Sequence, residues 1–544
     1  MRFFLLCAAL IALIDHASAQ ATADAGEAIY RHGILGSGAP LVASRAGGTR
    51  MEGKEAACVN CHRRSGFGAR EGLSIIPPIA GRYPYHSRVR KLEELDLPYV
   101  EGMRWDREPY TEASIARAIR EGVDSAGKPL SYLMPQFALN DADMAALIGY
   151  LKSLHQPRVP GVTDTVLHFA TIITPDADAV KRRGMLDVLE RYFADKNANP
   201  LGATPRLRSS RTMMFMVNRR WELHVWQLAG PEETWQGQLE RYLAKEPVLA
   251  VLSGLGGKTW APVHAFCERK SLPCLFPNLE VPPAGADRDF YSLYFSKGVL
   301  LEAELIANAI LDGASGSKAA KAVLQIYRAG DNGEPAAKAL AAALERQGVS
   351  AQTHVLRGGA GEGVGDALRD ASKVDALVLW LRPEDIAALG SAPVAPSAVF
   401  MSGLLGGLER SPLPTSWRDR THIAYPFDLP EKRHTRVNYA MGWFTIRKIP
   451  VVADQVQADT YLACGLLAET LSHMTDAFVR DYLVERLEDM LERRILTGYY
   501  PRLSLAAGQR YGSKGGYVVR FAEPQGTRLI ADHAWLVPRS QAHQ

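Results

Sequence analysis

The chain has 544 residues, and at about 150 residues per domain this length predicts three to four domains and excludes a single small module. A hydrophobic share of 47% and a charged share of 22% argue against wholesale disorder, a collagen-like repeat or a multi-span membrane protein. The 63 Lys and Arg residues against 59 Asp and Glu residues leave a net charge of +4, which is too small to indicate binding to nucleic acid or to an anionic membrane.

The first residues have the organisation of a secretory signal peptide. Arg2 supplies a positive charge, residues 3–14 are uninterrupted apolar sequence, and Ala17-Ser18-Ala19 is a small-residue cleavage site. An apolar run of this length is shorter than the about 20 residues that span a bilayer, which argues against a membrane anchor. We therefore expect a signal peptide at 1–19, cleaved after Ala19, and a mature protein in the periplasm of a Gram-negative bacterium with no transmembrane segment.

Residues 58–62 are Cys-Val-Asn-Cys-His, the pattern of covalent haem attachment. Two thiols one helical turn apart, Cys58 and Cys61, can add to the two vinyl groups of one porphyrin, and His62 then lies under the iron as the proximal ligand. A thioredoxin-like pair would need a strand before it, and a zinc site would need a second cysteine pair nearby. The preceding sequence is polar and the next cysteine is Cys267, so the motif predicts one covalently bound haem c.

The second iron ligand is expected downstream in the same domain. Met134 is followed by Pro135, which fixes its own backbone and keeps Met134 out of the α region. Its rivals are Met103, Met144 and His86. Met144 fits better into the core of a helix that begins after Asn140 or Asp141, and the other two lie in a long insertion at about 82–110.

These features resemble class I cytochrome c over roughly residues 22–156. The resemblance implies an all-α domain at 20–156 in which Met134 is the distal ligand and the last helix packs across the first, where Gly26 permits close approach and Tyr150 is a plausible partner. An iron with two protein ligands has no vacant position, so we expect an electron carrier and not an enzyme. A haem enzyme such as a peroxidase would need a vacant or labile position.

After a linker at 157–164, which contains Pro160 and Gly161, the pattern changes to alternating strands and helices. Such alternation predicts an α/β architecture with parallel sheets, and two such sheets would suit the remaining length. The expected strands are 166–173, 248–252, 321–327, 375–381 and 397–401.

The order of segments from about 165 to 540 resembles the type I periplasmic binding proteins, a group that includes the branched-chain amino-acid receptors of ABC transporters. The matching segments are 249–278, 289–310, 461–471 and 499–521. The resemblance implies a two-lobe domain at 165–544 with hinge crossings near 294–296 and 424–426, a small solute in the cleft between the lobes, and an ABC permease as a partner.

In that family the ligand lies where loops follow the strands, as open α/β sheets in general predict. The loop after 248–252 and the first crossing offer four candidates, which could also be plain turn residues: Ser253, Gly254, Thr259 and Tyr294. The loop after the first strand departs from the family because it contains Asp176 and Asp178. They could favour a cationic or hydroxylated ligand, or be solvated.

The remaining cysteines have separate expected roles. Cys267 ends a helix and Cys274 begins the next strand, so a disulfide between them is feasible in an oxidising compartment. Cys464 lies on an apolar helix face and is expected in a core. The sequence Gly257-Lys258-Thr259 resembles the end of a phosphate-binding loop, but the position that needs the first glycine is Leu252, so we reject that interpretation.

Two functions fit this organisation. The first is a periplasmic carrier of single electrons, fused to a domain that binds a solute or a partner, and serving a dehydrogenase respiratory chain or a terminal oxidase. The second is a transport receptor whose haem senses or reports redox state. The dehydrogenase context is an analogy.

Overall fold

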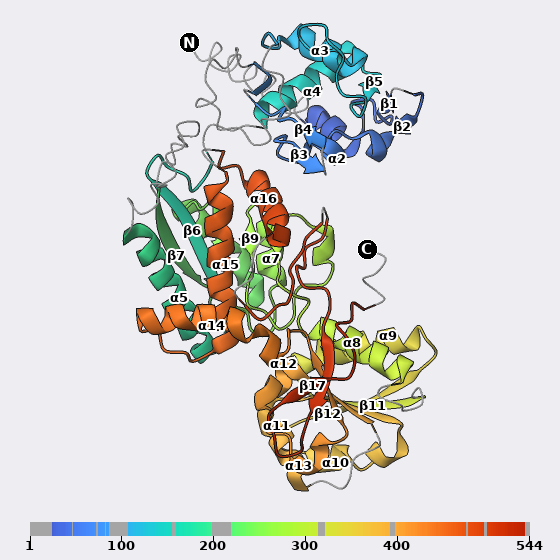
Figure 1. The fold of residues 1–544 in the computed structure, drawn as a ribbon, viewed down its shortest axis with the longest axis vertical. Helices are drawn as coiled ribbons and strands as arrows, with labels where there is room; N and C mark the ends of the chain where they lie inside the picture. The colour runs from blue at the N-terminus through green and yellow to red at the C-terminus, as the bar shows by residue number, and fades with distance from the viewer. Residues whose placement is uncertain are drawn as a thin grey trace, which may run out of the picture. The chain divides into compact units, whose positions relative to one another are not determined.

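The computed structural model (Figure 1) describes residues 24–45, 47–71, 74–81, 83–85, 107–154, 159–198, 219–313, 321–391, 398–474, 477–493, 498–506 and 508–538. These residues form two compact units. The first contains the described residues up to Thr165 together with 470–486, and the second contains the others. The predicted signal peptide, Met103 and His86 lie outside the described residues. Within the described part, no helix is both long and apolar enough to span a membrane.

The first unit is mainly helical, but the expectation of an all-α domain is wrong because short strands are also present. Three of them form an antiparallel sheet in the order β2-β1-β5, and two form the hairpin β3-β4. The strands are β1 (Val42–Ser44), β2 (Arg50–Glu52), β3 (Ala69–Glu71), β4 (Ser74–Ile76) and β5 (Gln136–Phe137). The helices are residues 24–32, α2 (Val59–His62), α3 (Glu112–Glu121) and α4 (Asp141–Ser153), and α16 (Arg480–Arg493) belongs to this unit as far as Arg486.

The crossing of the first helix with α4 is confirmed in detail. A side chain at Gly26 would lie 2.2 Å from the carbonyl oxygen of Ala146, so only glycine lets the two helices approach this closely. The rings of Tyr30 and Tyr150 pack with their centroids 5.4 Å apart. Asn140 caps α4, since its side chain accepts a hydrogen bond from the backbone N–H of Asp143 at 2.8 Å.

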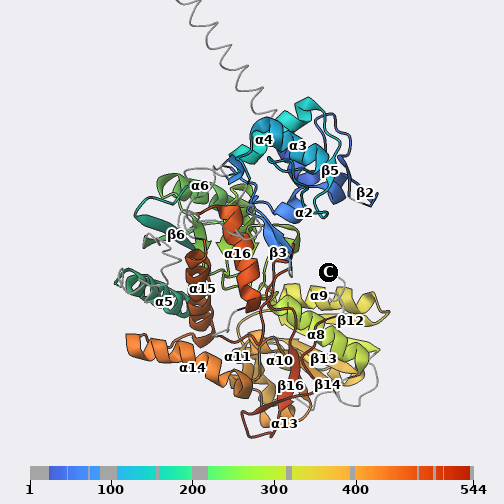
Figure 2. The ribbon, with the colours of Figure 1, turned by 45° about the horizontal axis from the view of Figure 1, so that its top comes forward.

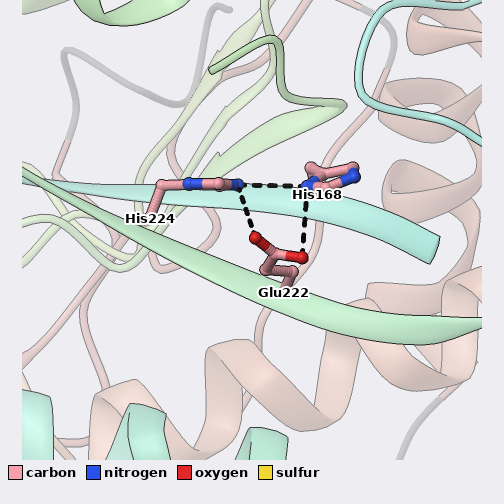
Figure 3. A group of neighbouring side chains, drawn as sticks. All are labelled: His168, Glu222 and His224. Atoms are coloured by element: carbon pink, nitrogen blue, oxygen red, sulfur yellow. Dashed lines mark hydrogen bonds and ion pairs between the residues drawn. The ribbon is translucent and has the colours of Figure 1, made fainter. Parts of the chain in front are cut away.

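The second unit contains two sheets with helices packed on them (Figure 2). The sheet of the first lobe has the order β10-β9-β8-β6-β7, and all of its strands are parallel. In the pair β6–β7, His168 lies opposite Glu222 (Figure 3). The strands are β6 (Val166–Ile173), β7 (Arg220–Gln227), β8 (Ala250–Leu252), β9 (Cys274–Leu275) and β10 (Ser292–Leu293).

Helices cover this first sheet on both faces. One face packs against α6 and α7 through a core that includes Trp226, Leu239 and Phe266. On the other face Phe169 contacts Phe193 of α5 edge to face, and α5 in turn packs on α14 through Val188 and Phe444. The helices are α5 (Ala179–Ala198), α6 (Trp235–Lys245), α7 (Ala261–Arg269), α14 (Pro430–Arg447) and α15 (Asp454–Ser472).

The sheet of the second lobe has the order β12-β11-β13-β14-β15-β16-β17. Its strands are parallel as far as β15, and β16 and β17 are antiparallel additions. The strands are β11 (Ala322–Arg328), β12 (Ser350–Leu356), β13 (Ala376–Trp380), β14 (Ala398–Ser402), β15 (Thr421–Tyr425), β16 (Tyr517–Phe521) and β17 (Leu529–Ala531).

Helices α8 and α9 pack on one face of this second sheet through a core that includes Leu305, Leu340 and Val378 (Figure 1). The helices of the lobe are α8 (Val299–Asp312), α9 (Gly333–Glu345), α10 (Val364–Ala367), α11 (Pro383–Ala387), α12 (Gly403–Gly406) and α13 (Thr415–Arg418). The five strands expected from the sequence are all present. Other strands were not expected, among them β7 and β12, in which apolar residues are interrupted by charged and polar ones.

In the part of the chain that the structure describes, three segments connect the two lobes. The chain leaves β10 and enters α8 through 294–298, leaves β15 and enters α14 through 426–429, and returns to β16 before Tyr517. The expected crossing near 294–296 falls within the first of these segments. The expected crossing near 424–426 adjoins the second, because Ala424 and Tyr425 still belong to β15. The third crossing was not foreseen.

Candidate functional site

The Cys-Val-Asn-Cys-His segment forms a single helical turn, α2. The backbone N–H of Cys61 donates to the carbonyl of Cys58 at 3.2 Å, and the N–H of His62 donates to the same carbonyl at 2.9 Å. The two cysteines are therefore one turn apart, which is the spacing that two vinyl groups on one porphyrin require.

His62 has the environment of a neutral imidazole with one nitrogen available for a metal. Its Nδ1 lies 3.3 Å from the carbonyl oxygen of Pro77, so a proton on Nδ1 is held there and the lone pair of Nε2 is left for iron. Burial lowers the pKa of His62 to about 4, which keeps the ring uncharged. These residues fit a covalently held haem.

The segment that follows His62 is fixed by contacts within the first unit. The backbone N–H and the hydroxyl of Ser65 donate to the carboxyl of Glu485 at 3.0 and 2.5 Å, and burial raises the pKa of Glu485 to about 8. Phe67 stacks on Tyr482 with the ring centroids 4.6 Å apart. A side chain at Gly68 would lie 1.9 Å from the carbonyl oxygen of Ile76, at the end of β4, so the entry into β3 requires glycine.

The proposed distal ligand and its rival differ in burial. Met134 is half-buried and, like Cys58, packs against the core of the first unit. Met144 is 3% exposed and belongs to that core, as the sequence predicted. Met134 as an iron ligand remains a prediction.

A cleft of about 610 Å³ lies between the two lobes of the second unit. As open parallel sheets predict, loops that follow strand ends line it. The loops after β6, β8 and β9 line it from the first lobe, and the loops after β11 and β13 line it from the second. The crossing segments contribute the aromatic residues Tyr294, Phe295, Phe427, Tyr499 and Tyr500.

Of the four ligand residues expected from the sequence, Tyr294 lines this cleft and the other three do not. The Tyr294 hydroxyl is hydrogen-bonded to Nδ1 of His264 at 2.8 Å. Ser253 is buried, with its hydroxyl 2.9 Å from that of Thr460. Gly254 lies under the ring of Trp260, and the hydroxyl of Thr259 accepts a hydrogen bond from the backbone of α7. The loop enters the cleft only from Leu255 onward.

The two acidic residues of the first loop accept hydrogen bonds from neighbouring groups of the chain. Asp176 accepts hydrogen bonds from the Thr174 hydroxyl at 2.6 Å and from the backbone N–H of Lys258 at 2.8 Å. Asp178 accepts from the N–H groups of Val180 and Lys181, at the start of α5. Both residues line the cleft, but these bonds hold the loop in place.

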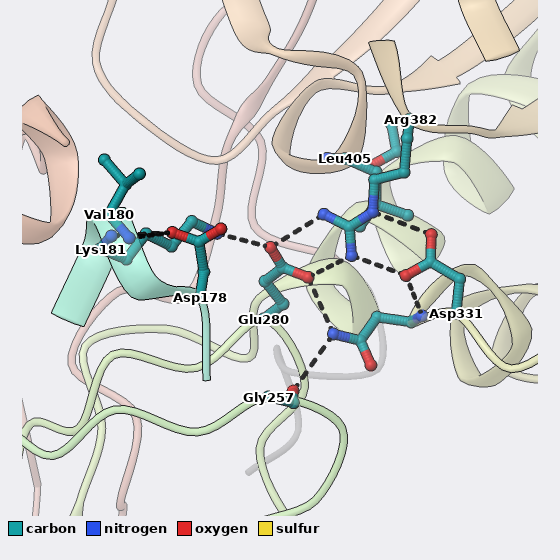
Figure 4. Close-up of polar contacts among 10 residues, drawn as sticks. Asp178, Val180, Lys181, Gly257, Glu280, Asp331, Arg382 and Leu405 are labelled. Atoms are coloured by element: carbon teal, nitrogen blue, oxygen red, sulfur yellow. Dashed lines mark hydrogen bonds and ion pairs between the residues drawn. The ribbon is translucent and has the colours of Figure 1, made fainter. Parts of the chain in front are cut away.

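An ion-pair network joins the two lobes across the cleft (Figure 4). Glu280, from the first lobe, accepts two hydrogen bonds from Arg382, at 3.0 and 2.7 Å, and contacts Lys181 at 2.9 Å. From the second lobe, Asn332 donates to Glu280 at 2.8 Å, and Asp331 also binds Arg382. Burial alone would raise the pKa of Glu280, but Arg382 and Lys181 hold it well below its usual range.

Asp459 is the one cleft carboxyl that is both buried and incompletely bonded among the described residues. It is 4% exposed; its Oδ2 lies 3.4 Å from the hydroxyl of Tyr500, and its Oδ1 has no hydrogen-bond partner in the described part of the chain. Burial raises its pKa to about 7. Phe427 packs against the rings of Tyr499 and Tyr500, at centroid distances of 5.4 and 5.3 Å. The cleft thus combines an aromatic wall with one acceptor that can receive a ligand's hydrogen bond.

Sequence reasoning missed Glu280, Arg382 and Asp459. A signal existed for Arg382, because it comes directly after the expected strand 375–381, and the loops after strand ends line such clefts. Asp459 lies within a helix and had no such signal.

The expected disulfide between Cys267 and Cys274 is wrong: both residues are thiols in the structure, and no disulfide joins them. Both are buried in the core of the first lobe, where they pack as small apolar side chains. Cys464 is fully buried in α15, as expected.

Comparison with known proteins supports the description of the first unit. Residues 52–155 match the family model of cytochrome c. The chain therefore contains a cytochrome c domain. A search of the curated proteins finds no match.

Solved structures that resemble the chain are substrate-binding proteins of ABC transporters. One from Thermomonospora curvata, described as a fatty acid ABC transporter substrate-binding protein, has 15% identity and a TM-score of 0.49, with 71% of this chain and 96% of that chain covered. A putative branched-chain amino acid ABC transporter from Rhodospirillum rubrum has 16% identity and a TM-score of 0.46, with 67% and 99% covered. One from Thermus thermophilus with bound valine has 9% identity and a TM-score of 0.48, with 69% and 98% covered. Likeness at this level says nothing about a ligand.

Proposed function

We propose that this protein is an exported carrier of single electrons, with one haem bound covalently through Cys58 and Cys61. The observation that carries the proposal is His62, which is buried and neutral and has its Nδ1 placed at the Pro77 carbonyl, so that Nε2 is ready to bind iron. The haem supplies reversible one-electron chemistry at its iron. The chain supplies the two cysteines that would attach the haem and His62 as the proximal iron ligand, and it buries that histidine.

Met134 is proposed as the second iron ligand. A thioether and an imidazole together would favour a high potential and would leave the iron no vacant position, which is why we propose a carrier and not an enzyme. Tyr132 and Leu133, directly before Met134, are 72% and 37% exposed. Exposed apolar side chains beside a redox centre suit transient contact with a redox partner, for which we propose a periplasmic dehydrogenase or a terminal oxidase.

Spectroscopy of the purified protein tests this function. The reduced protein should show the sharp α and β bands of a six-coordinate c-type haem, and the haem should stay with the chain on a denaturing gel. The reduced form should not bind carbon monoxide at neutral pH. A chain without covalent haem would refute the proposal, and rapid carbon monoxide binding would favour a haem enzyme such as a peroxidase.

A second candidate function is that of a solute receptor, working with an ABC permease, whose haem reports redox state. The specific observation in its favour is Asp459, a buried carboxyl in an aromatic cleft with one oxygen left without a partner among the described residues. Such a group favours a ligand with an apolar body and a hydrogen-bond donor, such as an amine or a hydroxyl.

A thermal-shift screen of the haem-loaded protein against small amines, alcohols and amino acids, in both redox states, tests this candidate. A ligand that binds the folded state raises the melting temperature. A shift that differs between redox states would favour the receptor with a redox report. If no compound changes the melting temperature, the receptor function is refuted and electron transfer remains the proposed function.

A further inference from the structure

Three side chains with metal-binding groups meet on the first-lobe sheet (Figure 3). In the parallel pairing of β6 with β7, His168 lies opposite Glu222, and His224 follows two residues later on the same face. Nδ1 of His168 lies 3.1 Å from Nε2 of His224. The Glu222 carboxylate faces both rings: its Oε2 lies 3.8 Å from Nδ1 of His168, and its Oε1 lies 3.7 Å from Nε2 of His224.

These separations are those of ligands around one metal ion. Zinc binds imidazole nitrogen and carboxylate oxygen at about 2.0–2.2 Å, which in a tetrahedron places the ligand atoms about 3.3–3.6 Å apart. The distance between the two nitrogens, and the distance from each nitrogen to its nearer Glu222 oxygen, lie within a few tenths of an ångström of that range. One ligand atom from each residue lies within 4.8 Å of the other two, so a small rotation of the carboxylate brings one oxygen to both nitrogens. Two imidazoles and one carboxylate form a ligand set typical of zinc, and the half-exposed Glu222 leaves a fourth position for water.

The surroundings of His224 supply an independent argument. Its other ring nitrogen, Nδ1, lies 3.4 Å from the carboxylate of Glu246, which accepts a hydrogen bond from Nε1 of Trp226 at 3.1 Å. A carboxylate beside Nδ1 of a metal-binding histidine favours a proton on that nitrogen, and the lone pair of Nε2 then points toward His168 and Glu222. Two histidines that only pack against each other would not need a carboxylate beside Nδ1 of His224.

We propose that His168, Glu222 and His224 bind a divalent transition-metal ion, zinc by ligand type and geometry. His168 is near the amino end of β6, and the cleft lies beyond the carboxyl end of the strand, about 20 Å away at about 3.3 Å per residue. The ion therefore does not contact a cleft ligand. It joins β7, the edge strand of the sheet, to β6.

The test uses the haem-loaded protein, in which Cys58 and Cys61 are held by haem and do not compete for zinc. After dialysis against a chelator, the protein is titrated with zinc chloride, and bound zinc and iron are counted by mass spectrometry. We expect one zinc per chain at submicromolar affinity. The zinc X-ray absorption spectrum should show two imidazoles with bonds of about 2.0–2.1 Å.

Variants assign the residues. His224→Ala and Glu222→Gln should each weaken zinc binding by at least about tenfold. Because the Glu222 side chain is exposed, its substitution should not disturb folding, and a loss of affinity in Glu222→Gln can be assigned to the lost ligand. His354→Ala, at an exposed histidine on β12, is the matched control and should bind zinc as the parent does. Zinc retained by a His168→Ala/His224→Ala double variant, or no zinc bound by the parent at micromolar concentration, would overturn the proposal.

Discussion

The haem segment and the cleft are two sites built in opposite ways. In the haem segment, the two cysteines and the histidine lie within five consecutive residues on one helical turn, and the backbone alone sets their spacing. In the cleft, Lys181, Glu280, Arg382 and Asp459 come from four distant parts of the chain, and only the fold brings them together. A local site is therefore sensitive to substitution of its own residues, and a dispersed site also to changes in the lobes that position it.

The largest effect is expected from the local site. A Cys58→Ala/Cys61→Ala double variant should lose all covalent haem, because no thioether can form. Haem staining after denaturing electrophoresis measures this. The Cys267→Ala/Cys274→Ala double variant is the control, and it should keep its haem because neither thiol is near the motif in sequence or forms a disulfide. Loss of haem in the control would show that attachment depends on more than the motif.

Removal of the proposed distal ligand comes next. Met134→Ala should lower the reduction potential by more than about 60 mV, a tenfold change for one electron, and open the iron to carbon monoxide. Met144→Ala removes a buried core side chain and should lower stability by about 2–5 kcal/mol without moving the potential. Potentiometric titration and thermal unfolding separate the two. A shifted potential in Met144→Ala alone would assign the ligand to Met144.

In the cleft, the largest effect is expected from Asp459. Its pKa is raised by burial to about 7, so the folded state favours the protonated form, and stability falls as pH rises from about 4 to about 7. Asp459→Asn should remove this loss and gain a few kcal/mol over the parent at pH 8, with little difference at pH 4. Denaturant unfolding at several pH values measures the difference. Asp366→Asn, at an exposed carboxyl, should give no such trend.

A smaller effect is expected at the bridge between the lobes. Glu280→Gln keeps the shape of the side chain but removes the charge that Arg382 and Lys181 share, and should lower stability by about 1–2 kcal/mol, since these groups are partly exposed. Small-angle X-ray scattering should show lobes that are further apart. Glu334→Gln, in an exposed pair with Lys338, is the control. An unchanged scattering curve in Glu280→Gln would mean that the bridge does not hold the lobes.

The features of each site that depend on residues close together in the chain could be predicted from the sequence. The attachment motif and the strand positions follow from spacing and periodicity, which depend on neighbouring residues, and the glycine at the helix crossing follows from the resemblance to class I cytochrome c. The cleft residues expected after the strand 248–252 do not line the cleft for a physical reason. The ring of Trp260, at the start of α7, covers Gly254, and Thr460, from the distant helix α15, lies against the hydroxyl of Ser253. The His168, Glu222 and His224 group needed the pairing of β6 with β7, and β7 itself was not expected.

The ion pair of Glu280 and Arg382 opposes the binding of any ligand that needs the two lobes to separate. A ligand that needs the lobes apart must first separate these charges, so its apparent affinity is its affinity for the open form multiplied by the fraction of molecules that are open. Because dissolved salt screens partly exposed ion pairs, raising ionic strength increases that fraction. An uncharged ligand would then bind more tightly in high salt, the reverse of what is usual for a cleft lined with charges.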